Sequence, residues 1–339
     1  MRDRQPIDND KRKIVIDMVF FQINRSGIAR VWDSLLRVWA DTAFAEQLII
    51  LDRCKTAPRI RGYCYIDIPA YNYGDMDADC AMLQAMCDQL DAVLFLSTYY
   101  TRPISTPSIL MVHDMIPEKL NWDLGQPMWV GKNSAIDEAA QYICVSNNTA
   151  SDLLFYHPES KGKITVAHCG VDARFHQPSE EEILNFKAKY QLSKPYFLLV
   201  GERSAHKNIG LFFSTVAQRA NQTLFEVVCL GARAELETEF SNLASHTKVT
   251  MLRVSDDEMR SAYSGALALV YPSLYEGFGL PVVEAMASGC PDITCPSGSI
   301  PEIAGDDVLY AGIDDVQTII KAMLAVQQPT IRESLVSAG

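Results

Sequence analysis

Two glutamates in the last third of the chain flank a glycine-rich turn, and their spacing suits a phosphorylated sugar. Seven residues separate Glu276 from Glu284, and Gly277 and Gly279 lie between them. Pro281 fits the first turn of a helix, where its missing N–H costs nothing. The free amides of such a helix start bind an anion such as a diphosphate, and glycines let the backbone approach it closely. Two nearby carboxylates would repel that anion unless they accept hydrogen bonds from sugar hydroxyls.

A second segment supplies positive charge. It reads Val200-Gly201-Glu-Arg203-Ser-Ala-His-Lys207 and follows an apolar run. Arg203 and Lys207, four residues apart at a strand-to-helix turn, can both reach one diphosphate. When a bond to that diphosphate breaks, its negative charge rises, and two fixed cations would stabilise it without a metal.

Two segments in the first half of the chain follow apolar strands. His113 ends the run that begins at Ile109 and opens His113-Asp114-Met-Ile-Pro117, where the ring could donate to a sugar hydroxyl or near the anomeric carbon. The alternative is a histidine that covers the core while Asp114 bonds the turn. Gly27 lies in Arg25-Ser-Gly27-Ile-Ala-Arg30 and would let the backbone approach a ligand closely. The alternative is that this glycine only allows the chain to turn.

Together these segments resemble the retaining glycosyltransferases of the GT-B fold, family 4 (glycosyl transferases group 1). The resemblance implies that Glu276 contacts the transferred sugar at its reacting face and that Glu284 holds the ribose. The catalytic residues it implies are His113, Glu276, Arg203 and Lys207. The implied donor-binding residues are Gly27, Gly201, Arg203, Lys207, Arg253, Val254, Gly277, Phe278, Gly279, Leu280 and Glu284.

The resemblance implies that Arg253 and Val254 bind the nucleobase, because family members use backbone atoms beside the corresponding turn for this contact. Since backbone atoms make the contact, no side chain in the sequence tells which base is bound. The sequence departs from the family pattern in three places. Ala29 replaces the second glycine of the first-domain loop. Asp292 replaces an apolar strand residue, and we expect its carboxylate at the rim of the sheet or in a shared hydrogen bond. The third departure is at the end of the chain, where the family typically continues, so we expect either a second domain that is truncated or an enzyme that is unusually short.

The elements that must position these residues form two α/β domains. Short β-rich apolar runs alternate with helical patterns, which is typical of parallel sheets covered by helices. The alternation pauses between Asp172 and Pro195 and then restarts. We therefore expect a Rossmann-like acceptor-side domain over 1–175 and a Rossmann-like nucleotide-sugar domain over 176–339, the two facing each other across a cleft as in GT-B enzymes.

The amino-acid composition disfavours several other classes of protein. Of 339 residues, 30 are Lys or Arg and 42 are Asp or Glu, so the net charge of −12 disfavours nucleic acid as a partner. The nine cysteines include no C-x-x-C pair, and we expect reduced core residues in a cytoplasmic protein. The basic N-terminus has no apolar core that would make it a signal or an anchor. Its charges permit a peripheral contact with the inner face of a membrane.

The expected function is metal-independent, retaining transfer of a hexose from a nucleoside diphosphate sugar to a hydroxyl of a saccharide or lipid-linked oligosaccharide in polysaccharide biosynthesis. UDP-glucose is the first expectation for the donor and GDP-mannose the second, and no other cofactor is expected. A nucleotide-sugar epimerase and a sugar-nucleotide-binding pseudoenzyme stay open as alternatives. An NAD-dependent oxidoreductase is disfavoured because no G-x-G-x-x-G follows either opening strand.

Overall fold

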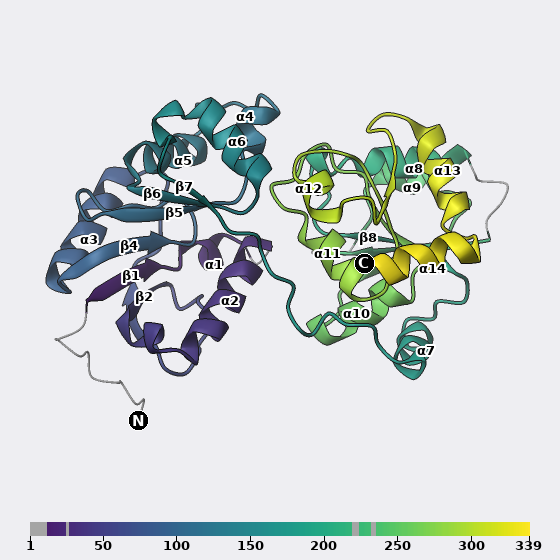
Figure 1. The fold of residues 1–339 in the computed structure, drawn as a ribbon, viewed down its shortest axis with the longest axis horizontal. Helices are drawn as coiled ribbons and strands as arrows, with labels where there is room; N and C mark the ends of the chain where they lie inside the picture. The colour runs from purple at the N-terminus through teal and green to yellow at the C-terminus, as the bar shows by residue number, and fades with distance from the viewer. Residues whose placement is uncertain (1–11, 25–26, 219–223, 232–234) are drawn as a thin grey trace. The chain divides into compact units, whose positions relative to one another are not determined.

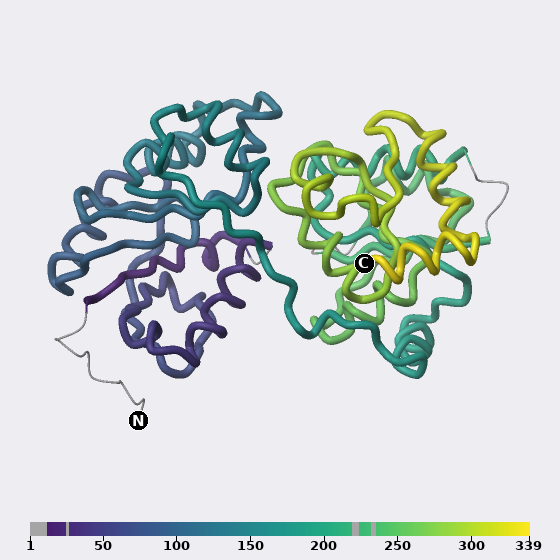
Figure 2. The backbone as a smooth tube through the Cα atoms, viewed as in Figure 1, coloured from purple at the N-terminus to yellow at the C-terminus, as the bar shows by residue number. Residues whose placement is uncertain are grey.

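A computed structural model describes residues 12–24, 27–218, 224–231 and 235–339 of the chain. The chain divides into two compact units, Met1–Cys169 and Gly170–Gly339 (Figures 1 and 2). Phe175, which the expected boundary assigns to the first domain, packs in the core of the second unit with its ring 6.2 Å from that of Tyr263. The described N-terminal residues begin at Arg12, so most of the basic segment lies outside them.

The first unit is built on a parallel sheet of seven strands in the order β3-β2-β1-β4-β5-β6-β7. The strands are β1 (Lys13–Asp17), β2 (Leu48–Arg53), β3 (Cys64–Ile68), β4 (Ala92–Ser97), β5 (Ser108–Val112), β6 (Gln141–Cys144) and β7 (Ile164–Val166). The helices are α1 (Val19–Ile23), α2 (Gly27–Ala40), α3 (Met76–Gln89), α4 (Ile116–Lys119), α5 (Pro127–Glu138) and α6 (Asn147–Tyr156), with short 3-10 turns at Ala43–Gln47 and Pro158–Ser160.

The second unit repeats this plan with six parallel strands in the order β10-β9-β8-β11-β12-β13. The strands are β8 (Tyr196–Val200), β9 (Glu226–Leu230), β10 (Val249–Leu252), β11 (Ala268–Tyr271), β12 (Asp292–Thr294) and β13 (Leu309–Tyr310). The helices are α7 (Glu180–Lys189), α8 (Ile209–Gln218), α9 (Thr238–Leu243), α10 (Asp256–Ser264), α11 (Leu280–Ala287), α12 (Ile300–Ala304), α13 (Val316–Ala325) and α14 (Pro329–Ala338), with a 3-10 turn at Ala205–Lys207.

Both faces of the second sheet are buried, because successive side chains of a strand point to opposite faces. In β8, Tyr196 and Leu198 join the core beneath α10 and α11, while Phe197 and Leu199 join the core beneath α8 and α13 (Figure 1). This arrangement explains the unbroken apolar runs in the sequence. The predicted Rossmann-like architecture is confirmed for both units.

Each sheet reverses its strand order at one point, between β1 and β4 in the first unit and between β8 and β11 in the second. The loops that leave the two strands diverge there, and open α/β sheets bind ligands in the resulting crevice at the carboxyl ends of the strands. We call these two places the first and the second switch point. The residues of interest lie in the loops around them.

Two expectations about individual side chains are wrong. Asp292 lies in β12 at 1% exposure, and neither carboxylate oxygen has a hydrogen-bond partner among the described residues. The carboxyl group is therefore neither at the rim of the sheet nor in a shared hydrogen bond. Burial raises the pKa of Asp292 well above its usual range, which favours the neutral form. All nine cysteines are free, but Cys54 is exposed and only five are buried in the core.

Candidate active site

The second switch point contains a small pocket that is partly open to solvent. The ends of β8 and β11 and the turn after β8 line it, and its lining includes Gly201, Arg203, Lys207 and Tyr271. Gly201 has a φ of +106°, and a Cβ on the neighbouring Gly231 would lie 2.7 Å from the carbonyl oxygen of Gly201. Glycine is therefore favoured at 201 by its positive φ, and it is required at 231 for the two backbones to approach. The fold thus brings both predicted cations into one pocket.

Lys207 makes the principal polar contacts of this pocket. Its Nζ donates to Glu276 Oε1 at 2.7 Å and to the hydroxyl of Tyr271 at 2.8 Å. Burial would lower the pKa of Lys207, but attraction to Glu276 and the two hydrogen bonds outweigh it and raise the pKa. Burial would likewise raise the pKa of Glu276, but Lys207 holds it below the usual range. Both groups are therefore charged at neutral pH.

The backbone of Glu276 is held by the loop that precedes α12. The amide of Ser299 donates to the carbonyl of Glu276 at 3.0 Å, and the Ser299 hydroxyl lies 3.1 Å from the same oxygen and 2.8 Å from the carbonyl of Phe278. Gly298 has a φ of +59°, and a Cβ there would clash with the Glu276 backbone. This close contact fixes the position from which the Glu276 carboxylate reaches Lys207.

The start of α11 has the form that the sequence predicts. Gly279 precedes the helix with a φ of +98°, and a Cβ at this position would lie 2.5 Å from Ile300 Cδ1. Leu280 opens the helix, and Pro281, which has no N–H, occupies its first turn. The amide of Val282 donates to the carbonyl of Gly279 at 2.9 Å, and the positive end of the helix dipole at this turn attracts an anion. Glu284, one turn further on, is buried and accepts a hydrogen bond of 2.9 Å from the hydroxyl of Tyr263.

Arg203 is already paired. Its Nε donates to Glu237 Oε2 at 2.7 Å and a terminal nitrogen donates to the carbonyl of Glu235 at 2.8 Å, while the side chain is 4% exposed. Arg203 would therefore have to exchange a carboxylate for a phosphate in order to bind one. Glu237 lies in no recognisable motif, so the sequence alone does not predict this contact.

Arg253 and Val254 follow β10, two strands away from β8 in the sheet. Val254 packs against the core, and Ser255 caps α10 by accepting from the amide of Glu258. Neither Arg253 nor Val254 lines the pocket at the second switch point. Their predicted contact with a nucleobase stays a prediction.

In the first unit, His113 directly follows β5 and is 8% exposed. Its Nε2 is buried and has no hydrogen-bond partner among the described residues. Burial lowers the pKa of His113 to about 4, although Asp114 opposes the shift, so the ring is neutral at pH 7. Asp114 bonds the turn by accepting from the amide of Ile116 at 3.0 Å. An unpartnered ring nitrogen costs free energy that a ligand hydroxyl could recover.

Gly27 begins α2, at the carboxyl edge of the first sheet. Arg25 and Ser26, which complete the predicted loop, lie outside the described residues. The proposed contact of Gly27 with a donor phosphate therefore stays a prediction.

Comparison with known proteins identifies the family. A family model described as "Glycosyl transferases group 1" matches residues 194–328, which include the whole charged pocket. The O-antigen chain mannosyltransferase B of Escherichia coli is 28% identical over 270 residues, which cover 75% of this chain and 70% of that protein. Residues 194–328 of the chain belong to the group 1 glycosyl transferases.

A second relative agrees with this assignment, and two solved structures share the fold. The O-antigen chain mannosyltransferase RfbU of Salmonella typhimurium (strain LT2) is 28% identical, and the match covers 69% of this chain and 65% of RfbU. Sucrose-phosphate synthase from Thermosynechococcus elongatus superposes with a TM-score of 0.77 at 16% identity, covering 97% of this chain and 93% of that one. Anabaena HepE, solved with UDP and glucose, gives a TM-score of 0.76 at 15% identity, covering 96% and 93%.

These findings confirm the predicted family, the GT-B fold and the enzyme class. This glycosyltransferase is a hexosyltransferase of family 4, a retaining and metal-independent family. Among the described residues no helix has both the length and the apolar character needed to cross a membrane.

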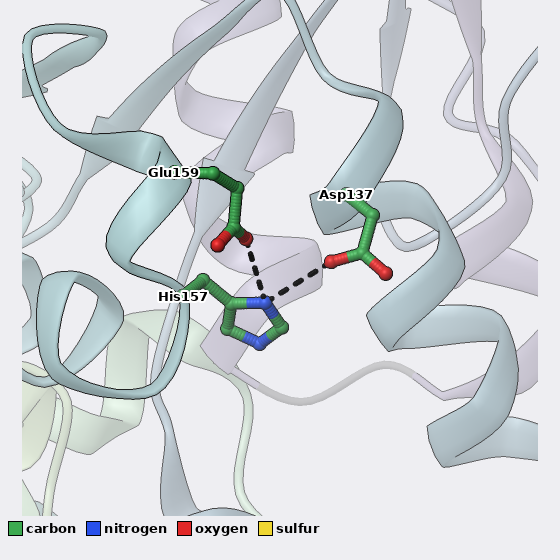
Figure 3. Close-up of side chains that lie close together, drawn as sticks. All are labelled: Asp137, His157 and Glu159. Atoms are coloured by element: carbon green, nitrogen blue, oxygen red, sulfur yellow. Dashed lines mark hydrogen bonds and ion pairs between the residues drawn. The ribbon is translucent and has the colours of Figure 1, made fainter.

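One side-chain cluster of this glycosyltransferase has ligand types that metals accept. Figure 3 shows His157 Nδ1 facing Asp137 Oδ1 at 3.2 Å and Glu159 Oε1 at 3.3 Å. Asp137 precedes β6, and His157 and Glu159 precede β7, so the cluster lies at the amino edge of the first sheet, whereas His113 lies at the carboxyl edge. The contacts with one ring nitrogen account for the cluster, and we assign it no metal.

Proposed function

We propose that this protein transfers a mannosyl residue from GDP-mannose to a hydroxyl of a saccharide or lipid-linked oligosaccharide in polysaccharide biosynthesis. The observation that carries the proposal is the buried Lys207–Glu276 pair at the second switch point. Cations beside a helix N-terminus suit a diphosphate, and a carboxylate beside them suits a sugar hydroxyl.

The choice of donor rests on the relatives. Both O-antigen relatives are named mannosyltransferases, which favours GDP-mannose, the second expectation from the sequence, over UDP-glucose. The likeness to HepE, solved with UDP and glucose, is at 15% identity and supports the fold alone.

Different residues of the second unit would contact different parts of the donor. Lys207 and the first amides of α11 would hold the diphosphate, and Arg203 would join them after leaving Glu237. Glu276 would then accept from a hydroxyl of the mannose, and Glu284 from the ribose. In the first unit, neutral His113 would donate to a sugar hydroxyl or accept from one through its unpartnered nitrogen.

Retention of configuration follows if the acceptor attacks from the face that the diphosphate leaves. The bond between the anomeric carbon and the phosphate oxygen breaks, and a bond to the acceptor oxygen forms on the same face. The acceptor proton passes to the departing phosphate oxygen. Lys207 and Arg203 stabilise the charge that develops there, in a buried environment where charge interactions are stronger than in water.

A ligand screen tests the donor. Melting of the protein is measured with GDP, UDP and ADP and with their sugar conjugates, because a ligand at about 100 times its dissociation constant stabilises by about 2.7 kcal/mol. We expect the largest shift with GDP and GDP-mannose. A shift with UDP compounds alone would reject GDP-mannose and leave the enzyme class intact.

Product analysis separates the alternatives. With GDP-mannose and a saccharide acceptor, the proposal predicts a new α-mannoside and free GDP. An epimerase would convert the sugar nucleotide without any acceptor. A pseudoenzyme would bind a nucleotide and yield no product with any donor.

A further inference from the structure

The turn that follows His113 in the first unit is held by a buried ion pair. Lys132 on α5 lies with its Nζ 2.6 Å from Glu118 Oε2, and Glu118 belongs to α4, the helix after His113. The side chains of Lys132 and Glu118 are 1% and 3% exposed, so both charges are removed from water. The lysine Nζ also lies 5.7 Å from the centre of the Tyr100 ring, whose face attracts a cation. No step of the proposed transfer uses this pair.

A second contact of Lys132 reaches the backbone next to His113. Its Nζ donates to the carbonyl oxygen of Asp114 at 3.4 Å, which is a long hydrogen bond. The carboxylate of Asp114 accepts from the amide of Ile116 at 3.0 Å and so leads the chain into α4. Lys132 therefore contacts the turn at both ends, at the backbone after His113 and at the carboxylate of Glu118.

Stability alone does not explain this ion pair. Removing two charges from water costs free energy that their attraction only partly returns, and apolar side chains of similar volume are often at least as stable. Glu118 Oε1 adds to the cost, because it is buried and has no hydrogen-bond partner among the described residues. A buried pair can instead be retained because it selects one conformation. The conformation at stake here is that of the turn after β5.

Helix α5 gives the lysine an anchored base. Ile136 lies in the core of the first unit, and its carbonyl accepts from the hydroxyl of Tyr142 at 2.6 Å. Arg102, which follows β4, donates to the hydroxyl of Ser134 at 3.1 Å. Because these contacts hold the helix on both sides of the sheet's core residues, the position of Lys132 Nζ determines where the turn lies.

The position of the turn matters because it carries His113. The ring of His113 is buried, and its Nε2 has no hydrogen-bond partner among the residues that the structure describes. No hydrogen bond from the protein therefore orients that nitrogen, and its direction depends on packing and on the backbone of the turn. A misplacement of about 1 Å at a reacting group can cost a hundredfold in rate.

We propose that Lys132 and Glu118 are positioning residues for transfer, which fix the turn that presents His113 to the sugar. They act through the turn rather than by contact with a substrate. This inference rests on the proposed function, in which His113 contacts a sugar hydroxyl. Breaking the pair should therefore lower kcat and leave the Kd for GDP unchanged, since the proposed nucleotide site belongs to the second unit.

Variants of the pair separate positioning from stability. Lys132→Met leaves the charge of Glu118 buried and unpaired, so this variant should be destabilised. The double variant Lys132→Met/Glu118→Met buries neither charge and should melt near the wild-type temperature. Neither variant holds the carbonyl of Asp114, so kcat should be about ten- to a hundredfold lower in both when it is measured well below melting. Recovery of both stability and kcat in the double variant would show a structural pair and overturn the proposal.

Lys119→Met is the matched control on α4. Lys119 also forms an ion pair, with Nζ 3.0 Å from Asp152 Oδ1, but its side chain is 45% exposed. Exposed pairs contribute little, so melting and transfer should both be unchanged in this variant. A loss of transfer in Lys119→Met equal to that in the double variant would mean that any change near the turn slows the enzyme, which would overturn the specific role of Lys132.

His113→Ala separates this inference from the proposed function. Slow transfer by His113→Ala together with normal transfer by the double variant would overturn the inference alone. Normal transfer by His113→Ala would overturn the proposed role of His113 and the inference with it.

The ring of His113 provides a second readout that does not depend on activity. NMR spectra of histidine-labelled protein show the ring C–H resonances, and that of His113 is the one missing from His113→Ala. We expect this resonance to shift in the double variant and to keep its place in Lys119→Met. An unshifted resonance in the double variant would show that the turn stays in position without the pair, and the proposal would fail.

Discussion

The two switch points share one topology and differ in chemistry. Both lie where a parallel sheet reverses its strand order, and both hold a pocket. The second has Lys207, Arg203 and Glu276 around it, whereas the lining of the first is uncharged and contains four tyrosines. The fold therefore determines where ligands bind, and the loops determine which ligands those are.

The largest effect should come from removing charge at the second switch point. Lys207→Met and Glu276→Gln should each lower kcat/KM for transfer by about 10²–10³-fold, since each removes a group aimed at the donor. Each single variant also leaves a buried charge without its partner, which destabilises the fold. The double variant has neither charge, so it should melt at a higher temperature than Lys207→Met and stay inactive.

Lys189→Met is the matched control for this test. Lys189 also forms an ion pair in the second unit, with Nζ 2.6 Å from Glu258 Oε1, but its side chain is 60% exposed. Transfer should be unchanged in this variant. Normal activity in Lys207→Met and Glu276→Gln would show that the charged pocket is not the donor site.

A smaller effect should follow from moving Glu276 without replacing it. Gly298→Ala places a Cβ against the backbone of Glu276, and a displacement of about 1 Å at a reacting group can cost a hundredfold in rate. Gly162→Ala also forces an alanine into positive φ, at +80°, but no atom lies within 4 Å of its Cβ. Melting curves should show a loss of about 1–2 kcal/mol from backbone strain in both, and a further loss in Gly298→Ala from the clash with the Glu276 backbone. Transfer should fall only in Gly298→Ala, and equal rates in the two variants would contradict the positioning role.

The smallest effect concerns the neutral form of the buried His113 ring. Because the folded pKa of His113 is about 4 and the unfolded value is about 6.5, the unfolded state binds more protons between these values, and stability falls as the pH falls. Between pH 7 and pH 5 we expect His113 to account for a loss of about 2 kcal/mol in the free energy of unfolding. Denaturant titrations of the wild type and His113→Gln at both pH values measure it. A loss of equal size in both proteins would mean that His113 is not buried in its neutral form.

Local patterns in the sequence predicted much of the second switch point. Glu276, Lys207 and the start of α11 are close in sequence to a strand end, so their types and spacing suffice to find them. Contacts between distant segments could not be found in this way. Tyr271 and Ser299 reach Lys207 and Glu276 from 64 and 23 residues away, and neither lies in a motif that specifies that contact.

The first unit was harder to predict, and the physical reasons differ by element. β1 ends at Asp17, and the apolar residues Val19 and Phe20 that continue its run in the sequence belong to α1. β3 is mostly half-buried at the edge of its sheet and lacks a clear apolar run, while the apolar residues of α5 follow no helical stripe. The cluster of tyrosines at the first switch point was missed because its residues come from two loops and two helices that only the folded chain brings together.

The pairing of Arg203 with Glu237 and of Lys207 with Glu276 means that these two pairs together have no net charge before a donor arrives. Over longer distances the protein, at −12, repels a nucleotide. Association is thus slowed by the protein as a whole, and capture depends on phosphate oxygens displacing carboxylate oxygens at close range. Added salt, which weakens binding to a basic surface, should instead speed the encounter of this enzyme with its donor.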